Sequence, residues 1–264
     1  MGRLTKKQQK QIHYFLREKA ERKHKHQILH DDRIPKFLER HLPFVRRLAR
    51  NLDQLVIVSS FASPPLKTGL IDRFLVLTEL ENLHAVVCLN KSDLADNPQQ
   101  VEEIAQIYRN IGYDTVVTSA KKPEGIEALY ALIKNKRSAF AGHSGVGKSS
   151  LLNAINPDLQ IQVDEVSSYT NKGKHTTTKV RIYTVDEHTE VLDLPGIKIL
   201  DFIDIHYTEA RFYYPEFEAY AEHCKFRDCI HISENNCAVK EAVEAGKISS
   251  LRYESYRNFI DSLK

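Results

Sequence analysis

The eight residues at positions 142–149, Gly-His-Ser-Gly-Val-Gly-Lys-Ser, match the pattern G-x-x-x-x-G-K-S. A phosphate-binding loop of this kind lies between a β-strand and the helix that it opens, because its backbone amides and the helix N-terminus together hold the phosphates. Both neighbours are present, since residues 138–141 predict a strand and residues 149–155 predict a helix. The loop therefore requires an α/β sheet around it.

Strand-like and helical segments alternate on both sides of the loop. Short apolar runs predict strands at residues 55–58, 85–89, 115–118 and 138–141, a pair at 179–185 and 190–192 completes six strands, and helical spacing predicts helices at 69–80, 101–111 and 125–133. Apolar strands separated by helices are typical of a largely parallel sheet covered on both faces. We expect a six-stranded, mostly parallel α/β domain at residues 51–200, a helical arm at 1–50 and a small helical domain at 201–264.

The tetrad Asn90-Lys91-Ser92-Asp93 follows the predicted strand 85–89. A carboxylate at Asp93 can accept hydrogen bonds from the ring N–H and the exocyclic amine of guanine, which adenine does not offer in that arrangement. Taken alone, the tetrad could be an ordinary turn, since Asn and Asp are common turn residues. A second loop, Ser119-Ala120-Lys121, follows the next strand. Together the two loops predict a guanine pocket.

Two more motifs follow the phosphate loop. Residues 173–178 (GKHTTT) offer threonine hydroxyls to Mg²⁺ and a γ-phosphate, and residues 193–196 (DLPG) offer a carboxylate to the metal's water shell and an N–H to the γ-phosphate. DLPG alone could be an ordinary turn. Because carboxyl ends of parallel strands meet at one rim, we expect all these motifs to share one site. Their order is circularly permuted, and the segment after 196 is placed to follow the motion of DLPG.

Three of the four cysteines lie within a stretch of 14 residues. Cys224, Cys229 and Cys237, with His231 among them, form a Cys3His set that suits tetrahedral Zn²⁺ with no open position, which is typical of a structural site. The alternative is three free thiols in a small core beside an incidental histidine. Cys88 stands in an apolar run and is interpreted as a small hydrophobic residue.

Tyr253, Tyr256 and Phe259 recur at helical spacing near the end of the chain, among Lys and Arg residues. A packed helix face is one interpretation. Contact with RNA through stacking and phosphate binding is the other. The sequence leaves both open.

Charge divides the chain unevenly. Residues 1–50 hold 15 Lys and Arg against five Asp and Glu, a balance of +10, whereas the whole chain carries only +3. A basic arm beside an acidic body favours an anionic partner such as RNA, although it could also be a solvated tail. The sequence has no apolar run long enough to predict a membrane span, and its first residues do not resemble a signal peptide. We therefore expect a cytoplasmic protein with no membrane partner.

The motif order, ending in Cys-x4-Cys-x-His-x5-Cys, resembles that of the circularly permuted ribosome small-subunit-dependent GTPase A (RsgA) family. The resemblance covers about four fifths of the chain, from residue 51 to the end. It implies hydrolysis of GTP to GDP stimulated by the 30S subunit, a role in late 30S maturation and contact with 16S rRNA. It also implies Mg²⁺ at the nucleotide and agrees with one structural Zn²⁺. We expect a monomer.

The resemblance also assigns roles to residues. Guanine recognition falls to Asn90, Lys91 and Asp93, supported by Ser119, Ala120 and Lys121. The nucleotide's phosphates fall to Gly142, His143, Ser144, Gly145, Val146, Gly147, Lys148, Ser149 and Ser150, with Asp193 and Gly196 sensing the γ-phosphate. Mg²⁺ falls to Ser149 and Thr177, with Thr176 as the alternative, and Zn²⁺ to Cys224, Cys229, His231 and Cys237. Our own candidates for catalysis are Lys148, His175 and Thr177.

The sequence departs from relatives at two places. Ile197 follows DLPG where Ras-like enzymes carry the glutamine that orients water, so we expect slow intrinsic turnover with water positioned by His175 or by a ribosomal group. His175 could also be an ordinary surface histidine. Members of the family normally begin with a five-stranded OB barrel, which residues 1–50 are too few and too helical in pattern to build. The basic arm is our candidate substitute.

Two alternative functions remain. A permuted GTPase of large-subunit assembly is one, although the Cys3His set after DLPG argues against it. The other is an RNA-binding assembly factor that uses GTP mainly as a conformational ligand.

Overall fold

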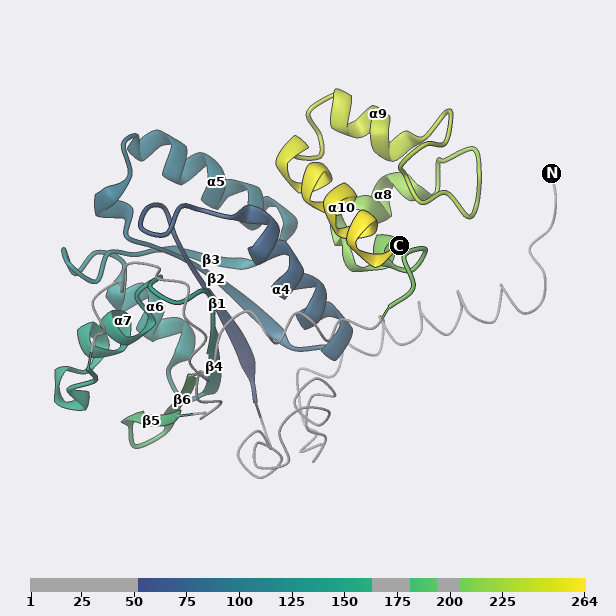
Figure 1. Ribbon diagram of the computed structural model, residues 1–264. Coiled ribbons are helices and arrows are strands. Elements are labelled where there is room, and N and C mark those ends of the chain that lie inside the picture. The colour runs from purple at the N-terminus through teal and green to yellow at the C-terminus, as the bar shows by residue number, and fades with distance from the viewer. Residues whose placement is uncertain (1–51, 163–180, 194–204) are drawn as a thin grey trace, which may run out of the picture. The chain divides into compact units, whose positions relative to one another are not determined.

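The computed structural model describes residues 52–162, 181–193 and 205–264 (Figure 1). The strands are β1 (Gln54–Ser60), β2 (His84–Asn90), β3 (Asp114–Val117), β4 (Arg137–Ala141), β5 (Arg181–Asp186) and β6 (Thr189–Asp193). The α-helices are α4 (Thr68–Glu81), α5 (Pro98–Ile111), α6 (Ile126–Ile133), α7 (Lys148–Ile155), α8 (Glu218–Ala221), α9 (Ala238–Glu244) and α10 (Ser250–Leu263). Short 3-10 helices are η1 (Ser92–Leu94), η2 (Pro157–Leu159), η4 (Ala210–Tyr213) and η5 (Pro215–Phe217).

The strands form one six-stranded sheet in the order β3-β2-β1-β4-β6-β5. Every neighbouring pair is parallel except β5 and β6, which are antiparallel. The predicted mostly parallel sheet is confirmed. Strand β1 lies between β2 and β4, so the strand that leads into the guanine tetrad and the strand that leads into the phosphate loop end at the same rim.

Helices cover both faces of the sheet, as the apolar strands predict (Figure 1). All seven residues of β1 are buried. On one face Leu55 and Ile57 pack with residues of α4 and α5, and on the other Val56 and Val58 pack with residues of α6 and α7. Each such aliphatic side chain contributes roughly 1.5–3 kcal/mol when fully buried.

Helix α5, which follows the guanine tetrad, has clear signals at both ends. The Asn97 side chain accepts a 2.9 Å hydrogen bond from the Gln99 N–H, and Pro98 occupies the first helical position, where no N–H is needed. Gly112 ends the helix with a left-handed φ of 106°. These signals fix where the tetrad loop ends and the helix begins.

Residues 205–264 build a second, largely helical core. Tyr256 and Phe259 are buried there, with Tyr214 and Phe217 stacked nearby. The packed-face interpretation is therefore confirmed for these two residues of α10, and Tyr253 is partly buried against the same core. Val76 of α4 belongs to the same core, and α10 packs against α4.

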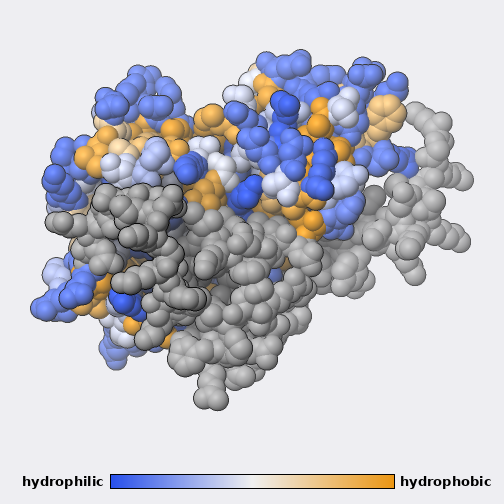
Figure 2. Space-filling view, in the orientation of Figure 1, coloured by the Kyte–Doolittle hydropathy of each residue, from blue (hydrophilic) through white to orange (hydrophobic). Residues whose placement is uncertain are grey.

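The predicted arm at residues 1–50 lies outside the described residues, as do residues 173–178 and 194–200. None of the helices in the described ranges has the length and apolar character needed to span a bilayer. Figure 2 shows hydrophilic side chains with scattered hydrophobic ones over the coloured surface.

Candidate nucleotide and metal sites

The phosphate loop connects β4 to α7, as predicted, and two of its glycines have no room for a side chain. A Cβ on Gly142 would lie 2.1 Å from the Val58 carbonyl oxygen, and one on Gly147 would lie 2.4 Å from Asn90 Nδ2. Both residues also have positive φ, 151° and 97°. The loop therefore packs its backbone against β1 and the guanine tetrad. This close approach leaves no alternative to glycine at either position.

Asn90 joins the guanine tetrad to the phosphate loop. Its side-chain amide donates to the Val146 carbonyl over 2.8 Å, and Asn90 itself is buried. The side-chain oxygen of Asn90, Oδ1, accepts a hydrogen bond from the Thr118 hydroxyl at 3.1 Å. Both ends of the amide are thus satisfied, which fixes its orientation. The two motifs, reversed along the chain, meet in space.

Lys91 makes a second connection. It has a left-handed backbone, φ 60°, and its Nζ donates to the Gly145 carbonyl at 2.7 Å and to the Ser63 carbonyl. Burial lowers the pKa of Lys91, and the charge of Asp93 acts in the opposite direction. Lys91 therefore ties the phosphate loop to the loop between β1 and α4.

Asp93 is oriented by the second predicted guanine loop. Ser119 donates from its hydroxyl to Asp93 Oδ1 at 2.6 Å, and the Ser119 oxygen accepts from the Lys122 N–H at 3.1 Å. Ser119 is buried, Ala120 is partly buried and Lys121 is exposed. The structure thus brings the tetrad and the Ser119-Ala120-Lys121 loop together, as expected.

Lys148 and Asp193 face each other across the site. Their charged atoms, Nζ and Oδ1, lie 4.0 Å apart, and Lys148 Nζ donates to the Gly142 carbonyl at 3.1 Å. Burial lowers the pKa of Lys148 and raises the pKa of Asp193. The positive charges of Lys148 and Arg181 act against burial and lower the pKa of Asp193. Asp193 Oδ1 is buried and has no hydrogen-bond partner among the described residues. A buried acceptor without a hydrogen bond is expected to bind a ligand or water.

The remaining predicted phosphate-loop residues lie where the motif places them. His143, Ser144 and Val146 are in the loop, and His143 Nδ1 lies 2.7 Å from the Ser144 carbonyl oxygen. Ser149 and Ser150 are in the first turn of α7. The predicted residues His175, Thr176, Thr177 and Gly196 fall outside the described residues, and their roles stay predictions.

Thr118, which the sequence does not predict as a site residue, supports Asn90 from the position directly after β3. Thr118 is fully buried and its Oγ1 lies 3.4 Å from Cys88 Sγ. Burial raises the pKa of Cys88 to about 12, so the thiol stays protonated. Cys88 is buried as expected but also contacts this polar pair. The available signal was the position of Thr118, directly before Ser119 in the second guanine loop.

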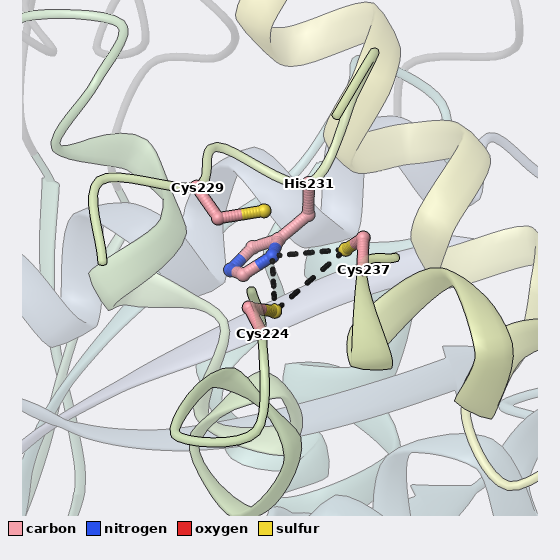
Figure 3. Close-up of side chains that lie close together, drawn as sticks. All are labelled: Cys224, Cys229, His231 and Cys237. Atoms are coloured by element: carbon pink, nitrogen blue, oxygen red, sulfur yellow. Dashed lines mark hydrogen bonds between the residues drawn. The ribbon is translucent and has the colours of Figure 1, made fainter. Parts of the chain in front are cut away.

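The four predicted metal ligands lie close together within residues 205–264 (Figure 3). One ligand atom from each of Cys224, Cys229, His231 and Cys237 lies within 4.8 Å of the others. Cys224 Sγ is 3.8 Å from Cys237 Sγ and 3.5 Å from His231 Nδ1, and His231 Nδ1 is 3.3 Å from Cys237 Sγ. The four donors are close enough to hold one metal ion.

Residues around the cluster fix its loop. Glu234 accepts backbone N–H groups from Ile230 at 2.7 Å and Ile232 at 2.9 Å. Arg211 donates to the Cys229 carbonyl at 2.6 Å, and Tyr253 donates to the His231 carbonyl at 2.7 Å. Arg211 and Glu234 were not predicted, because nothing in their local sequence distinguishes them from surface charges. Arg211 and the Cys229 carbonyl are 18 positions apart and meet only in the fold, whereas the partners of Glu234 are main-chain N–H groups of its own loop.

Comparisons with known proteins agree with this geometry. Residues 33–203 match the family model described as RsgA GTPase. The chain is 42% identical over 228 residues to the small ribosomal subunit biogenesis GTPase RsgA of Bacillus cytotoxicus, covering 86% of this chain and 78% of the relative. It is 43% identical over 234 residues to the protein of the same name from Geobacillus thermodenitrificans, covering 88% and 79%.

Two solved structures are similar. YjeQ from Thermotoga maritima has a TM-score of 0.67 and 41% identity, with 81% of this chain and 72% of that chain covered. YloQ, described as a circularly permuted GTPase, has a TM-score of 0.64 and 37% identity, with 81% and 68% covered. The permuted order seen here is thus shared with a solved relative.

Proposed function

Because this chain belongs to the RsgA GTPase family, we propose that its GTP hydrolysis serves the late maturation of the small (30S) ribosomal subunit. The names of its curated relatives support this role. The observation that carries the nucleotide site is the pair of hydrogen bonds from Asn90 and Lys91 to the phosphate-loop carbonyls of Val146 and Gly145. They make the guanine tetrad and the phosphate loop one unit.

In the proposed site, Asp93 accepts two hydrogen bonds from guanine while Ser119 holds the carboxylate in place. Backbone amides of the loop at residues 142–149 face the phosphates, and Lys148 adds a full positive charge. Phosphate oxygens would replace the Gly142 carbonyl as partners of Lys148 Nζ. Burial lowers the pKa of Lys148, and a bound phosphate would raise it again because an anion stabilises the ammonium.

The residues present also fit Mg²⁺. Asp193 Oδ1 is a buried acceptor that lacks a hydrogen-bond partner within the described residues, and Ser149 stands at the start of α7. We propose that Ser149 and Thr177 bind the ion directly and that Asp193 holds its water shell. Mg²⁺ there would neutralise charge on the β- and γ-phosphates.

Turnover by the isolated protein should be slow. Ile197 cannot orient water, and the proposed positioning group is His175 or a group of the ribosome. We propose that the 30S subunit stimulates turnover because the particle would supply the group that positions water.

The Cys3His cluster fits one structural Zn²⁺. Three thiolates and one imidazole are the donors that Zn²⁺ favours in closed tetrahedral sites. A Zn²⁺ held by all four would cross-link the loop of residues 224–237 and leave no position for substrate. The Sγ–Sγ distance of 3.8 Å agrees with two sulfurs on one tetrahedral ion.

We propose three parts for the chain: a basic arm at residues 1–50 that contacts 16S rRNA, the permuted GTPase domain at 51–200, and the zinc-binding domain at 201–264. The protein would act as a cytoplasmic monomer. Deleting residues 1–45 should weaken 30S binding and reduce its dependence on salt, because fewer phosphates are neutralised. Unchanged affinity and salt dependence would remove the arm's proposed role.

The deciding experiment is GTP hydrolysis with and without purified 30S particles, with Ser149→Ala as the inactive control. We expect strong stimulation by 30S and little by 50S. Turnover that 30S leaves unchanged would favour an assembly factor that uses GTP as a conformational ligand. Co-sedimentation with isolated 50S rather than 30S would favour a role in large-subunit assembly.

A further inference from the structure

A buried group of charges joins α10 to α4. The Arg252 side chain is only 2% exposed, and its Nη1 donates to Asp72 Oδ1 at 2.6 Å. Its Nε and Nη2 form a fork with the two carboxylate oxygens of Glu216 at 2.7 and 3.1 Å. Asp72 is fully buried and lies on α4, Glu216 lies on η5 and Arg252 lies on α10.

Neighbouring aromatic residues complete this group. Tyr108 of α5 donates from its hydroxyl to Asp72 Oδ1 at 3.1 Å, and the guanidinium carbon of Arg252 lies 4.6 Å from the Tyr214 ring centre. Burying a charge is costly, and apolar contacts such as that of Val76 could hold α10 against α4 at less expense. The two hydrogen bonds between the guanidinium and the carboxylate fix the orientation of the helix, since these groups pair well in only a few geometries. It therefore fixes how α10 sits on α4.

The N-terminal end of α4 is connected to the nucleotide site. Lys91 donates both to the Gly145 carbonyl in the phosphate loop and to the Ser63 carbonyl. Ser63 belongs to the loop at residues 61–67, which leads into α4, and Ser60 Oγ donates to the Pro64 carbonyl of that loop at 2.8 Å. A shift of the phosphate loop or of Lys91 would thus act on the residues that begin α4.

Helix α10 is in turn connected to the metal loop. Tyr253 donates to the His231 carbonyl at 2.7 Å, and Tyr256 donates to the Ile230 carbonyl at 2.6 Å. Arg252, Tyr253 and Tyr256 lie within five residues of one helix. The helix therefore reaches Asp72 of α4 through Arg252, and it reaches the metal loop through Tyr253 and Tyr256.

We propose that Arg252 is a positioning residue that transmits the nucleotide state to the metal-binding domain through α4. The physical route is the phosphate loop, Lys91, the loop at residues 61–67, α4, Arg252 and α10, each joined to the next by the chain itself or by the contacts above. This goes beyond motion inherited from DLPG, because every member of the route lies outside residues 194–204. It rests on the proposed nucleotide site.

The test compares hydrogen–deuterium exchange of the full chain bound to GDP and to a non-hydrolysable GTP analogue, without ribosomes. In the wild type, exchange at residues 224–237 should differ between the two nucleotides by roughly fivefold or more, a usual size for coupling between sites. Arg252→Met should bring this ratio close to one while nucleotide binding and metal content persist. Arg257→Met, an exposed cation on the same helix, is the matched control and should keep the wild-type ratio.

A second measurement needs no variant, so it holds even if Arg252→Met fails to fold. In the wild type, α4 and residues 224–237 should respond to the nucleotide together. A response at 224–237 with none in α4, or no response in either segment, would overturn the proposal, as would an Arg252→Met protein that keeps the wild-type ratio. Failure to bind guanine nucleotides at all would instead refute the nucleotide site.

Discussion

Asn90 and Val146 are 56 positions apart in the chain, yet the Asn90 amide donates to the Val146 carbonyl over 2.8 Å. One residue of the guanine tetrad therefore holds the phosphate loop in shape. The two motifs therefore meet in space although their order along the chain is reversed. What the site needs is the meeting of strand ends at one rim, and the sheet provides it whichever strand comes first.

Replacing Asn90 with Ala should weaken binding of both GDP and GTP. The change leaves the buried Val146 carbonyl without a donor and Thr118 without its acceptor, which costs about 1–3 kcal/mol per unpaired group. Affinity should fall roughly tenfold to a hundredfold. Titration with a fluorescent guanine nucleotide measures it. Asn110→Ala, on the exposed side of α5, is the control and should bind normally. Equal affinities for the two variants would contradict the proposed role of Asn90.

Gly147→Ala should abolish tight nucleotide binding. The new Cβ would meet Asn90 Nδ2 at 2.4 Å, so the loop or the tetrad must move. Gly112→Ala is a matched control, because Gly112 also has positive φ, 106°, but a Cβ there meets nothing within 4 Å. It should lower the melting temperature, through about 1 kcal/mol of backbone strain, without changing affinity. If Gly112→Ala lost nucleotide binding to the same extent, backbone strain alone, without the clash with Asn90, would explain the effect of Gly147→Ala.

Much of the fold follows from local sequence. The apolar runs at β1 and β2 predict buried strands, and their alternation with helices predicts the parallel sheet. The same rule predicts that the guanine tetrad and the phosphate loop lie at one rim of the sheet. These inferences succeed because strand direction and connection are set by short-range patterns.

Contacts made by ordinary residues could not be predicted in this way. Asp72 and Arg252 look like surface charges on amphipathic helices. They are 180 positions apart in the chain, and only the packing of α10 on α4 makes them a buried pair. Thr118 likewise reads as the last residue of a strand until Asn90 is brought beside it. Such long-range partners depend on how helices pack, which local periodicity leaves undetermined.

Asp93→Asn should reduce the preference for guanine. An amide can accept only one of the two hydrogen bonds that the carboxylate accepts, and the loss of charge removes a strong pair, about 1.5–3 kcal/mol. GTP affinity should fall at least about tenfold. Xanthosine triphosphate carries a carbonyl in place of the exocyclic amine and should lose less. Competition between the two nucleotides measures the ratio, with the exposed Asp96→Asn as control. An unchanged preference would remove Asp93 from base recognition.

Cys237→Ser should remove the metal and unfold the helical core of residues 205–264. Cys237 is 2% exposed and lies beside both Cys224 and His231, so losing its thiolate leaves three donors for a four-coordinate ion. Structural zinc sites of this kind contribute their binding free energy to folding, and a chelator should have the same effect. Metal analysis and the near-ultraviolet circular dichroism of the tyrosines, in a chain without tryptophan, report both losses. Cys88→Ala, the thiol outside the cluster, should retain one zinc per chain. Full zinc content in Cys237→Ser would mean that the cluster is not the metal site.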